Sequence, residues 1–137
     1  MILLDAGPLI ALFDPRDEHH RRCVTILASI DERLITTEPV LTEAFYMLEG
    51  TRGDAALREF LRGGGASLWT LDDEHLTRAL DLMDTYDDPP MGFTDASLVA
   101  AAEALRTTSV FTLDRADFAR YRPRIGRTAS RFKVLSV

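Results

Sequence analysis

The chain has 137 residues, 46% of them hydrophobic and 28% charged, which predicts one globular domain over residues 1–137 and excludes a disordered chain. Its single cysteine, Cys23, excludes a disulfide framework, and no apolar run reaches the ~18–20 residues of a membrane span, so we expect a cytoplasmic protein without membrane contact. The formal net charge of −6 argues only weakly against nucleic-acid binding, because the charge is unevenly distributed.

The first half of the chain alternates apolar runs with amphipathic segments. Residues 1–5, "MILLD", are an isoleucine and leucine run that ends in an acid, which predicts a buried strand. Pro8 suits the first turn of the helix that follows, because a backbone N–H is not needed there. The pattern continues with a helix over residues 17–30, a strand over 33–37, helices over 38–50 and 53–62, and a strand over 66–71.

The second half continues the alternation. A helix over residues 72–88 begins with acids, and its expected buried face comprises Leu76, Ala79, Leu80 and Met83. The next helix spans residues 91–105, with Thr94 as its expected N-cap. A strand over 109–114, a short helix over 115–121 and a fifth strand over 132–137 follow. This order predicts an α/β fold in which helices cover both faces of a mostly parallel five-stranded sheet.

Two acids end predicted strands of this sheet. Asp5 is the last residue of the first strand, and Asp114 is the last residue of the fourth. Open α/β sheets bind ligands outside the carboxyl ends of their strands, at the point where the strand order reverses. We therefore expect both carboxylates at the edge of the sheet where function lies.

Asp95 and Glu43 add two carboxylates from helices. Asp95 falls in the first turn of its helix, where the helix dipole alone would stabilise an acid by about 0.3–1 kcal/mol. Glu43 lies inside "VLTEAFYML", on or beside the face expected to pack against the sheet, with no basic residue three or four positions away. A buried, unpaired carboxylate is costly, which favours a bound cation. Four acids at one edge suit Mg²⁺ or Mn²⁺ and hydrolysis at phosphorus, although scattered acids are common without either.

Four segments that carry these acids occur in the order "LLDAGPLIAL", "TEAFYML", "PMGFTDASLVAAAE" and "VFTLDRADF". In this order and spacing, the chain resembles the PIN-domain ribonucleases over essentially its whole length, in particular the VapC-type toxins of bacterial toxin–antitoxin systems. The resemblance implies a PIN-like three-layer α/β/α sandwich and a metal-dependent endoribonuclease that uses Mg²⁺ or Mn²⁺. It also implies an RNA substrate, a cognate antitoxin as partner, and a homodimer with plausible contacts around residues 39–62.

The resemblance further implies which side chains form the site. The metal-binding and catalytic acids map to Asp5, Glu43, Asp95 and Asp114. Thr112 matches the small hydroxyl residue that precedes the last acid by two positions, and on a strand it would face the same side as Asp114. Such a hydroxyl could orient a water or a metal ligand.

One position departs from the family pattern. Many relatives carry an acid three residues before the one that matches Asp95, and this chain has Gly92 there. Asp117 is the substitute we consider, with helix capping as its alternative role.

The charge distribution separates an acidic body from a basic C-terminal segment. Residues 1–114 carry 21 acids against 9 Lys and Arg, whereas residues 115–137 carry seven basic residues against Asp117 alone. The basic segment could attract a polyanion, or its arginines could serve only to keep the protein surface soluble. Arg115 directly follows Asp114, so we expect it to contact substrate phosphate or an inhibitor.

Two alternative functions stay open from the sequence. A catalytically weak PIN domain could serve as a binding module, although retention of all four acids argues against this. A phospho-accepting receiver domain also has an acidic Mg²⁺ site at the sheet edge, and it needs a lysine late in the chain. Lys133, the only lysine, lies inside "FKVL" and is poorly placed for that role.

Overall fold

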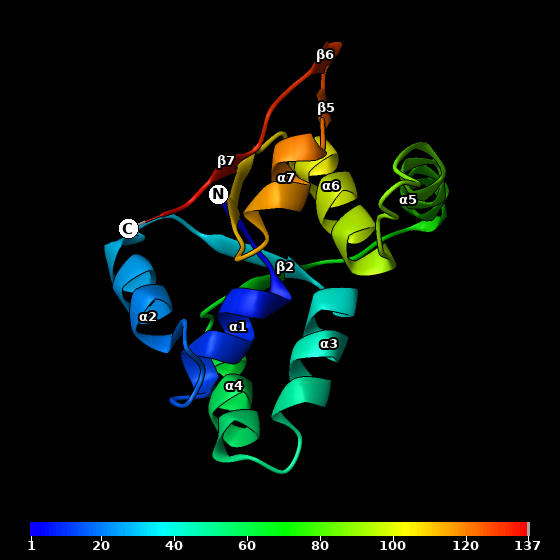
Figure 1. Cartoon of the computed structure of the whole chain (residues 1–137). Coiled ribbons are helices and arrows are strands. Elements are labelled where there is room, and N and C mark those ends of the chain that lie inside the picture. Colours follow the sequence, from blue (N-terminus) through cyan, green and yellow to red (C-terminus); the bar gives the residue numbers. More distant parts are fainter. Residues whose placement is uncertain (137) are drawn as a thin grey trace.

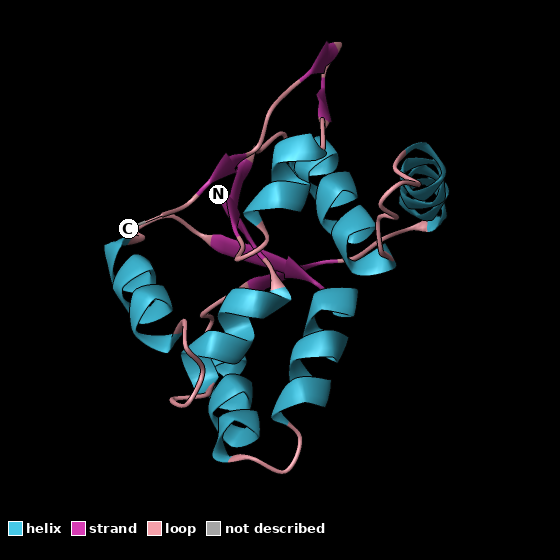
Figure 2. Cartoon of the chain, in the orientation of Figure 1, coloured by secondary structure: helices cyan, strands magenta, loops and turns pink. Residues whose placement is uncertain are grey.

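A computed structural model describes residues 1–136 and places a parallel sheet between two groups of helices (Figure 1, Figure 2). The strand order is β3-β2-β1-β4-β7, and every pairing in this sheet is parallel. The prediction of a mostly parallel five-stranded sheet is therefore confirmed. The strands are β1 (Ile2–Leu4), β2 (Leu34–Thr37), β3 (Ser67–Trp69), β4 (Ser109–Phe111) and β7 (Lys133–Val134).

Helices cover both faces of the sheet, which gives the predicted three-layer arrangement. Those that follow β1 and β2 gather on one side, where α1 contacts the other three (Figure 1). They are α1 (Ala6–Phe13), α2 (His20–Ser29), α3 (Glu38–Leu48) and α4 (Arg52–Arg62). On the other side lie α5 (Asp73–Thr85), α6 (Phe93–Leu105) and α7 (Arg115–Arg120), with α5 packed against α6.

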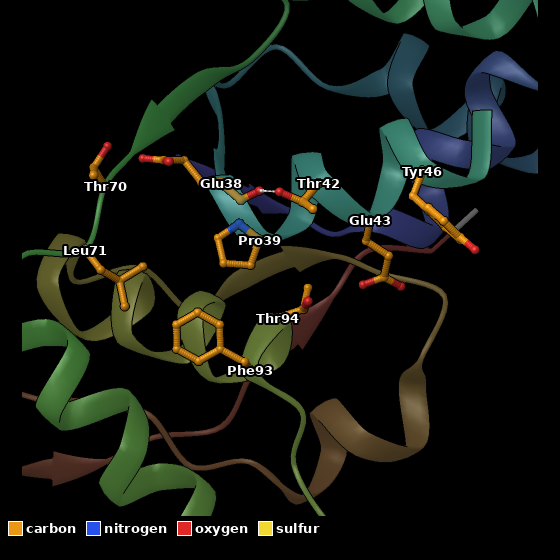
Figure 3. Close-up of a pocket in the computed structure, with 9 residues that line it drawn as sticks. All are labelled: Glu38, Pro39, Thr42, Glu43, Tyr46, Thr70, Leu71, Phe93 and Thr94. Carbon is orange, nitrogen blue, oxygen red and sulfur yellow. Dashed lines mark hydrogen bonds between the residues drawn. The ribbon is translucent and has the colours of Figure 1, made fainter. Parts of the chain in front are cut away.

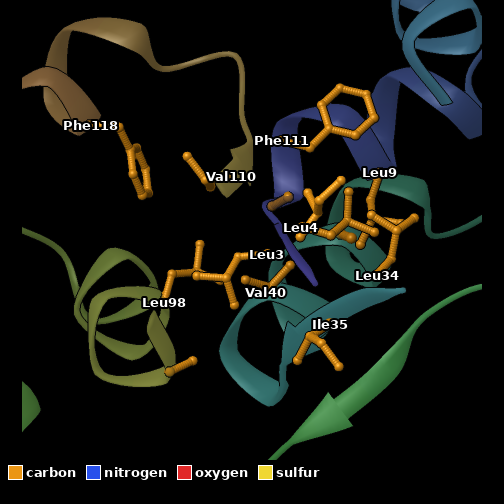
Figure 4. Close-up of a cluster of buried hydrophobic side chains, with 14 of the residues drawn as sticks. Leu3, Leu4, Leu9, Leu34, Ile35, Val40, Leu98, Val110, Phe111 and Phe118 are labelled. Atoms are coloured by element: carbon orange, nitrogen blue, oxygen red, sulfur yellow. The ribbon is translucent and has the colours of Figure 1, made fainter. Parts of the chain in front are cut away.

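The core forms on both faces of β1, because successive strand residues point to opposite sides of a sheet (Figure 4). Leu3 points toward Leu98 of α6, and Leu4 points toward Leu9 of α1. All four side chains are fully buried. Burial on both faces explains why this strand is a continuous apolar run without alternating polar residues.

The strand order reverses at β1, and this reversal positions the candidate site. The chain passes from β1 to β2 and β3 in one direction, and it later returns to place β4 on the opposite side of β1. Leu4 pairs with Phe111 in parallel register, so the carboxyl ends of β1 and β4 lie side by side. Residues that directly follow these two strands therefore meet at one edge.

Several expected boundaries and one expected face were wrong. The predicted strand 109–114 ends at Phe111, the predicted helix 72–88 ends at Thr85, and the predicted strand 132–137 is limited to Lys133–Val134 within the described residues. Its last residue, Val137, lies outside the described residues. In α5, Ala79 and Leu82 are the buried residues, whereas Leu76 and Leu80 are 39% and 49% exposed. The buried strip is narrow because α5 packs mainly against α6 alone.

Thr94 does not cap α6 as expected. Gly92 takes the N-cap position with extended backbone, and its carbonyl accepts the Ala96 N–H at 3.0 Å, so Thr94 already lies inside the first turn. The Thr94 carbonyl instead accepts the hydroxyl of Ser97 at 2.6 Å.

The C-terminal part contains a hairpin that was not predicted. Its antiparallel strands are β5 (Arg124–Ile125) and β6 (Thr128–Ala129), and Gly126 in the turn has a φ of 64°, which glycine adopts without steric cost. Across residues 1–136, no helix combines the length and the hydropathy that crossing a lipid bilayer would require.

Candidate active site

Three linked polar residues lie at the carboxyl ends of β1 and β4. Asp5 follows β1 directly and caps α1, where its carboxylate accepts the Ala6 N–H at 2.7 Å. Thr112 donates its hydroxyl to the Asp5 carboxylate at 2.7 Å and accepts the Asp114 N–H at 3.0 Å. Asp5 and Thr112 are only 8% and 2% exposed, so this network fixes the two strand ends relative to each other.

Asp95 reaches the same region from the first turn of α6. Its Oδ2 accepts the hydroxyl of Tyr121 at 2.7 Å, and the Tyr121 side chain is fully buried. The Tyr121 ring packs edge-on against Tyr86 and Phe118, with centroids 5.2 Å apart in each pair. Aromatic packing therefore fixes the phenol, and the phenol orients the Asp95 carboxylate.

Asp117 joins Asp95 and Asp114 in a cluster of carboxylates. One carboxylate oxygen of each lies within 4.8 Å of those of the other two. Asp114 caps α7 by accepting the Asp117 N–H at 3.1 Å, so the capping role considered for Asp117 belongs to Asp114. Arg120 approaches Asp117 at 3.4 Å and donates to the Pro89 carbonyl at 3.0 Å.

A cleft of about 410 Å³ collects the acids singled out from the sequence. It is lined by Asp5, Gly7, Glu43, Asp95, Leu113 and Asp114. Glu43 is exposed, so the expectation of a buried, costly carboxylate was wrong. Val40, Ala44 and Leu48, four residues apart, form the buried face of α3, and Glu43 lies beside that face on the rim of the cleft.

Removal from water raises the pKa of three carboxyl groups in this region. Burial raises the pKa of Asp5, and it raises the pKa of Asp95 from 3.8 to about 7. Desolvation also raises the pKa of Asp114, and its neighbour Asp117 adds to the effect. The hydroxyl groups of Thr112 and Tyr121 lower the pKa of Asp5 and Asp95, respectively, by less than burial raises it. Asp5, Asp95 and Asp114 therefore hold protons more tightly than ordinary carboxyl groups, unless a cation replaces the protons.

Tyr121 is the site residue that the sequence did not reveal. It ends "RADFARY", where Phe118 and Tyr121 are three residues apart on one apolar face. This spacing marks burial, and a buried tyrosine hydroxyl needs a partner, but the pattern does not name Asp95 as that partner. Arg115 is exposed at the first position of α7 and forms no ion pair within residues 1–136, so its contact with phosphate stays a prediction.

An apolar groove of about 650 Å³ adjoins the acidic cleft, and Glu43 lines both (Figure 3). Pro39, Leu71 and Phe93 gather along it in the close-up. Tyr46, which also lines the groove, is 74% exposed. The groove beside the acidic cleft is thus largely apolar, and planar rings could stack against it.

Comparison with known proteins identifies families and structures that this chain resembles. Residues 2–122 match the PIN domain family. The protein named "Ribonuclease VapC26" from Mycobacterium tuberculosis is 28% identical over 137 residues, which cover 98% of this chain and 99% of that protein. The match therefore extends over nearly the full length of both chains.

Solved structures with the same fold come from three bacteria. The toxin VapC20 of Mycobacterium tuberculosis, described as cleaving the sarcin-ricin loop, has a TM-score of 0.77 at 19% identity over 84% of this chain and 91% of that one. A toxin–antitoxin complex from Klebsiella pneumoniae has a TM-score of 0.70 at 20% identity over 88% and 92%. VapBC2 of Rickettsia felis, bound to a promoter DNA fragment, has a TM-score of 0.59 at 15% identity over 98% of both chains.

The family match covers most of the chain and includes Asp5, Glu43, Asp95 and Asp114. The fold, with its reversal of strand order at β1, agrees with that of the solved toxins. The chain therefore belongs to the PIN domain family.

Proposed function

We propose that this chain is a metal-dependent endoribonuclease that hydrolyses RNA phosphodiester bonds and acts as the toxin of a toxin–antitoxin pair. The observation that carries the proposal is the convergence of Asp5, Glu43, Asp95 and Asp114 on one cleft. Membership of the PIN domain family and full-length similarity to a protein named as a ribonuclease support it. A receiver domain is not supported, because the family match extends over residues 2–122.

Mg²⁺ or Mn²⁺ fits the donors of the cleft. Asp95, Asp114 and Asp117 offer carboxylate oxygens within 4.8 Å of one another, and an all-oxygen donor set suits these hard cations. Asp5 and Glu43 complete the negative lining. Burial raises the pKa of Asp95 to about 7, and a cation beside this carboxyl group would favour its charged form. When bound, the cation would supply charge stabilisation at the phosphate and lower the pKa of an attacking water.

The chain's own residues position the acids and hold the substrate. Thr112 connects Asp5 to Asp114 by two hydrogen bonds, which hold these two acids in place relative to each other. Arg115 follows Asp114 and is exposed, which suits contact with a substrate phosphate. Among the described residues that line the cleft, none is a serine, cysteine or histidine, and the proposed reaction uses water as the nucleophile.

The partners of the proposed toxin are an RNA substrate and a cognate antitoxin. Similar solved structures include a toxin–antitoxin complex and the VapBC2 assembly, which supports an antitoxin partner here. We also propose a homodimer, because α3 exposes large apolar side chains, with Tyr46 and Met47 74% and 58% exposed. Residues 1–137 would act as a single domain in this assembly.

Metal removal tests the enzymatic proposal directly. Incubation with a mixture of structured RNAs should yield discrete fragments in Mg²⁺ or Mn²⁺, and excess EDTA should reduce cleavage to the background of a no-protein control. Restoring either cation should restore cleavage. A folded protein that binds RNA and never cleaves it in any of these cations would instead favour a catalytically weak PIN domain that serves as a binding module.

Tyr121→Phe should weaken metal binding about 10- to 100-fold, because removing a group that orients a ligand has this typical effect. The change deletes only the hydroxyl that contacts Asp95 at 2.7 Å and keeps the buried ring. Calorimetric titration with Mn²⁺ measures the affinity. Tyr46→Phe is the matched control, since its hydroxyl lies on an exposed side chain, and it should bind Mn²⁺ as the wild type does. Equal affinities for all three proteins would show that Tyr121 does not orient the ligand.

A further inference from the structure

The hairpin β5–β6 and the residues beside it form the most strongly basic part of the chain. No acid occurs after Asp117, whereas six basic residues do. The hairpin projects beyond α6 and α7, away from the rest of the chain (Figure 1). Arg124, Arg127 and Arg131 are exposed, and none forms an ion pair within the described residues 1–136. We call these three arginines the basic arm.

Hydrogen bonds hold the backbone of the basic arm in place, whereas its guanidinium groups form no ion pair with the described residues 1–136. The Arg124 N–H donates a hydrogen bond to the Glu103 carboxylate at 2.7 Å. The Arg78 guanidinium donates two further hydrogen bonds, of 2.8 and 2.9 Å, to the same carboxylate. The Ser130 N–H donates to the Pro123 carbonyl at 2.8 Å and closes the base of the hairpin. Glu103 is therefore already paired with Arg78 and forms no ion pair with the arm.

Arg106 adds a fourth positive charge at the same place. It ends α6 with a φ of 55°, a left-handed conformation that is costly for any residue with a Cβ. Its Nη2 lies 3.8 Å from the position that a Cβ on Gly126 would take, so the side chain reaches the hairpin turn. Arg106, which follows the C-terminal end of α6, thus adds to the charge of the arm, whereas the N-terminal end of α6 carries Asp95.

The cleft of acids lies at the N-terminal end of α6, and the basic arm lies at its C-terminal end. Asp95 and Arg106 are eleven positions apart on one helix, which corresponds to roughly 16 Å. A strand of nucleic acid advances ~3.4 Å per nucleotide in helical form, so roughly five nucleotides cover this distance. An RNA held in the cleft can therefore reach the arm.

We propose that the basic arm binds the phosphate backbone of the RNA whose scissile bond lies in the acidic cleft. This inference rests on the proposed ribonuclease function. Residues 1–114 carry 21 acids against 9 Lys and Arg, so the body of the chain repels a polyanion. Unpaired, exposed arginines on a projecting hairpin supply sequence-independent contacts that offset this repulsion.

The salt dependence of RNA binding tests the proposal. Arg124→Gln, Arg127→Gln and Arg131→Gln are combined in a cleavage-deficient Asp95→Asn background, and affinity for a labelled single-stranded RNA is measured against salt concentration. The slope of log affinity against log salt should become shallower by about two, because each phosphate contact contributes ~0.7. Affinity at low salt should fall roughly tenfold.

A matched control removes the same charge elsewhere. Arg21→Gln, Arg22→Gln and Arg52→Gln change exposed arginines on α2 and α4 without altering the hairpin, and this variant should keep the parent slope. Circular dichroism confirms that both triple variants are folded. An equal loss in both variants, or an unchanged slope in the arm variant, would overturn the proposal. Full RNA affinity in the arm variant would likewise overturn it.

Parallel cleavage assays separate this inference from the proposed function. With the active wild-type cleft, the arm variant should show a higher KM and an unchanged kcat, because it alters binding outside the cleft. If the wild type cleaves RNA and the arm variant has wild-type KM, only the arm proposal fails. If the Asp95→Asn protein cleaves RNA as the wild type does, the proposed function fails, whatever the salt slopes are.

Discussion

An Asp95→Asn variant should fold as the wild type does and cleave RNA roughly a thousandfold more slowly, since a catalytic cation contributes several kcal/mol and each ~1.4 kcal/mol is a factor of ten. Asparagine keeps an oxygen that can accept the Tyr121 hydroxyl, which lies 2.7 Å away, so local packing is retained. It removes a negative charge where oxygens of Asp114 and Asp117 lie within 4.8 Å. An amide is a weaker ligand for a hard cation than a carboxylate, so metal affinity and cleavage should fall together.

Asp84→Asn provides the matched control for this variant. Asp84 is exposed on α5, so the same chemical change there should alter neither Mn²⁺ affinity nor the rate of RNA cleavage. Cleavage rates are followed on gels at saturating Mg²⁺, and thermal unfolding verifies the fold of both variants. A folded Asp95→Asn protein that cleaves at the wild-type rate would remove Asp95 from the site and contradict the nuclease proposal.

The metal-free protein should lose stability as the pH rises from about 4 to about 7. Burial raises the pKa of Asp95 from 3.8 to about 7, so the folded state binds this proton more tightly than the unfolded state does. The resulting stabilisation is complete below the ordinary pKa of 3.8 and is lost as the pH rises through about 7. Each pKa unit corresponds to ~1.36 kcal/mol, so the free energy of unfolding should fall by a few kcal/mol. Burial also raises the pKa of Asp5 and Asp114, which act in the same direction.

Urea unfolding in EDTA across this pH interval measures the effect. Saturating Mg²⁺ should restore stability at the upper end, because a cation binds the deprotonated carboxylates and replaces their protons. Asp95→Asn should have a flatter pH profile than the wild type, whereas Asp84→Asn should have a parallel one. Superimposable profiles for the wild type and Asp95→Asn in EDTA would show that Asp95 does not titrate as described.

The sheet and two of its acids could be predicted because the relevant signals are local. "MILLD" predicts a buried strand that ends in an acid, and the alternation of strands and helices predicts a parallel sheet. Together they indicate that Asp5 lies where ligands bind. Asp114 was expected in the same region, although it lies three residues beyond the end of β4 and caps α7.

Glu43 and Tyr121 show where sequence reasoning fails. The sequence pattern places Glu43 on or beside the inner face of its helix. Because a helix rotates by ~100° per residue, only the fold shows that Glu43 lies beside that face, exposed at the rim of the cleft. Tyr121 contacts Asp95 across 26 residues of sequence, and no periodic pattern encodes such a pairing. Long-range polar contacts depend on the packing of whole elements, which only the assembled fold defines.

The hairpin was missed for a different reason. Its strands have two residues each, too few for an alternating pattern to stand out, and only Gly126 marks the turn. The exposed Leu76 and Leu80 of α5 were misassigned because a helix with a single neighbour buries a narrower strip than a core helix does.

The hydrogen bond from Thr112 to Asp5 joins residues separated by 107 positions. During synthesis, a ribosome exposes Asp5 early, yet its hydroxyl partner leaves the exit tunnel only when most of the polypeptide has been made. The nascent chain thus cannot assemble the complete centre until β4 docks beside β1. Any cleavage of RNA by this protein would therefore begin only after most of the chain has been synthesised.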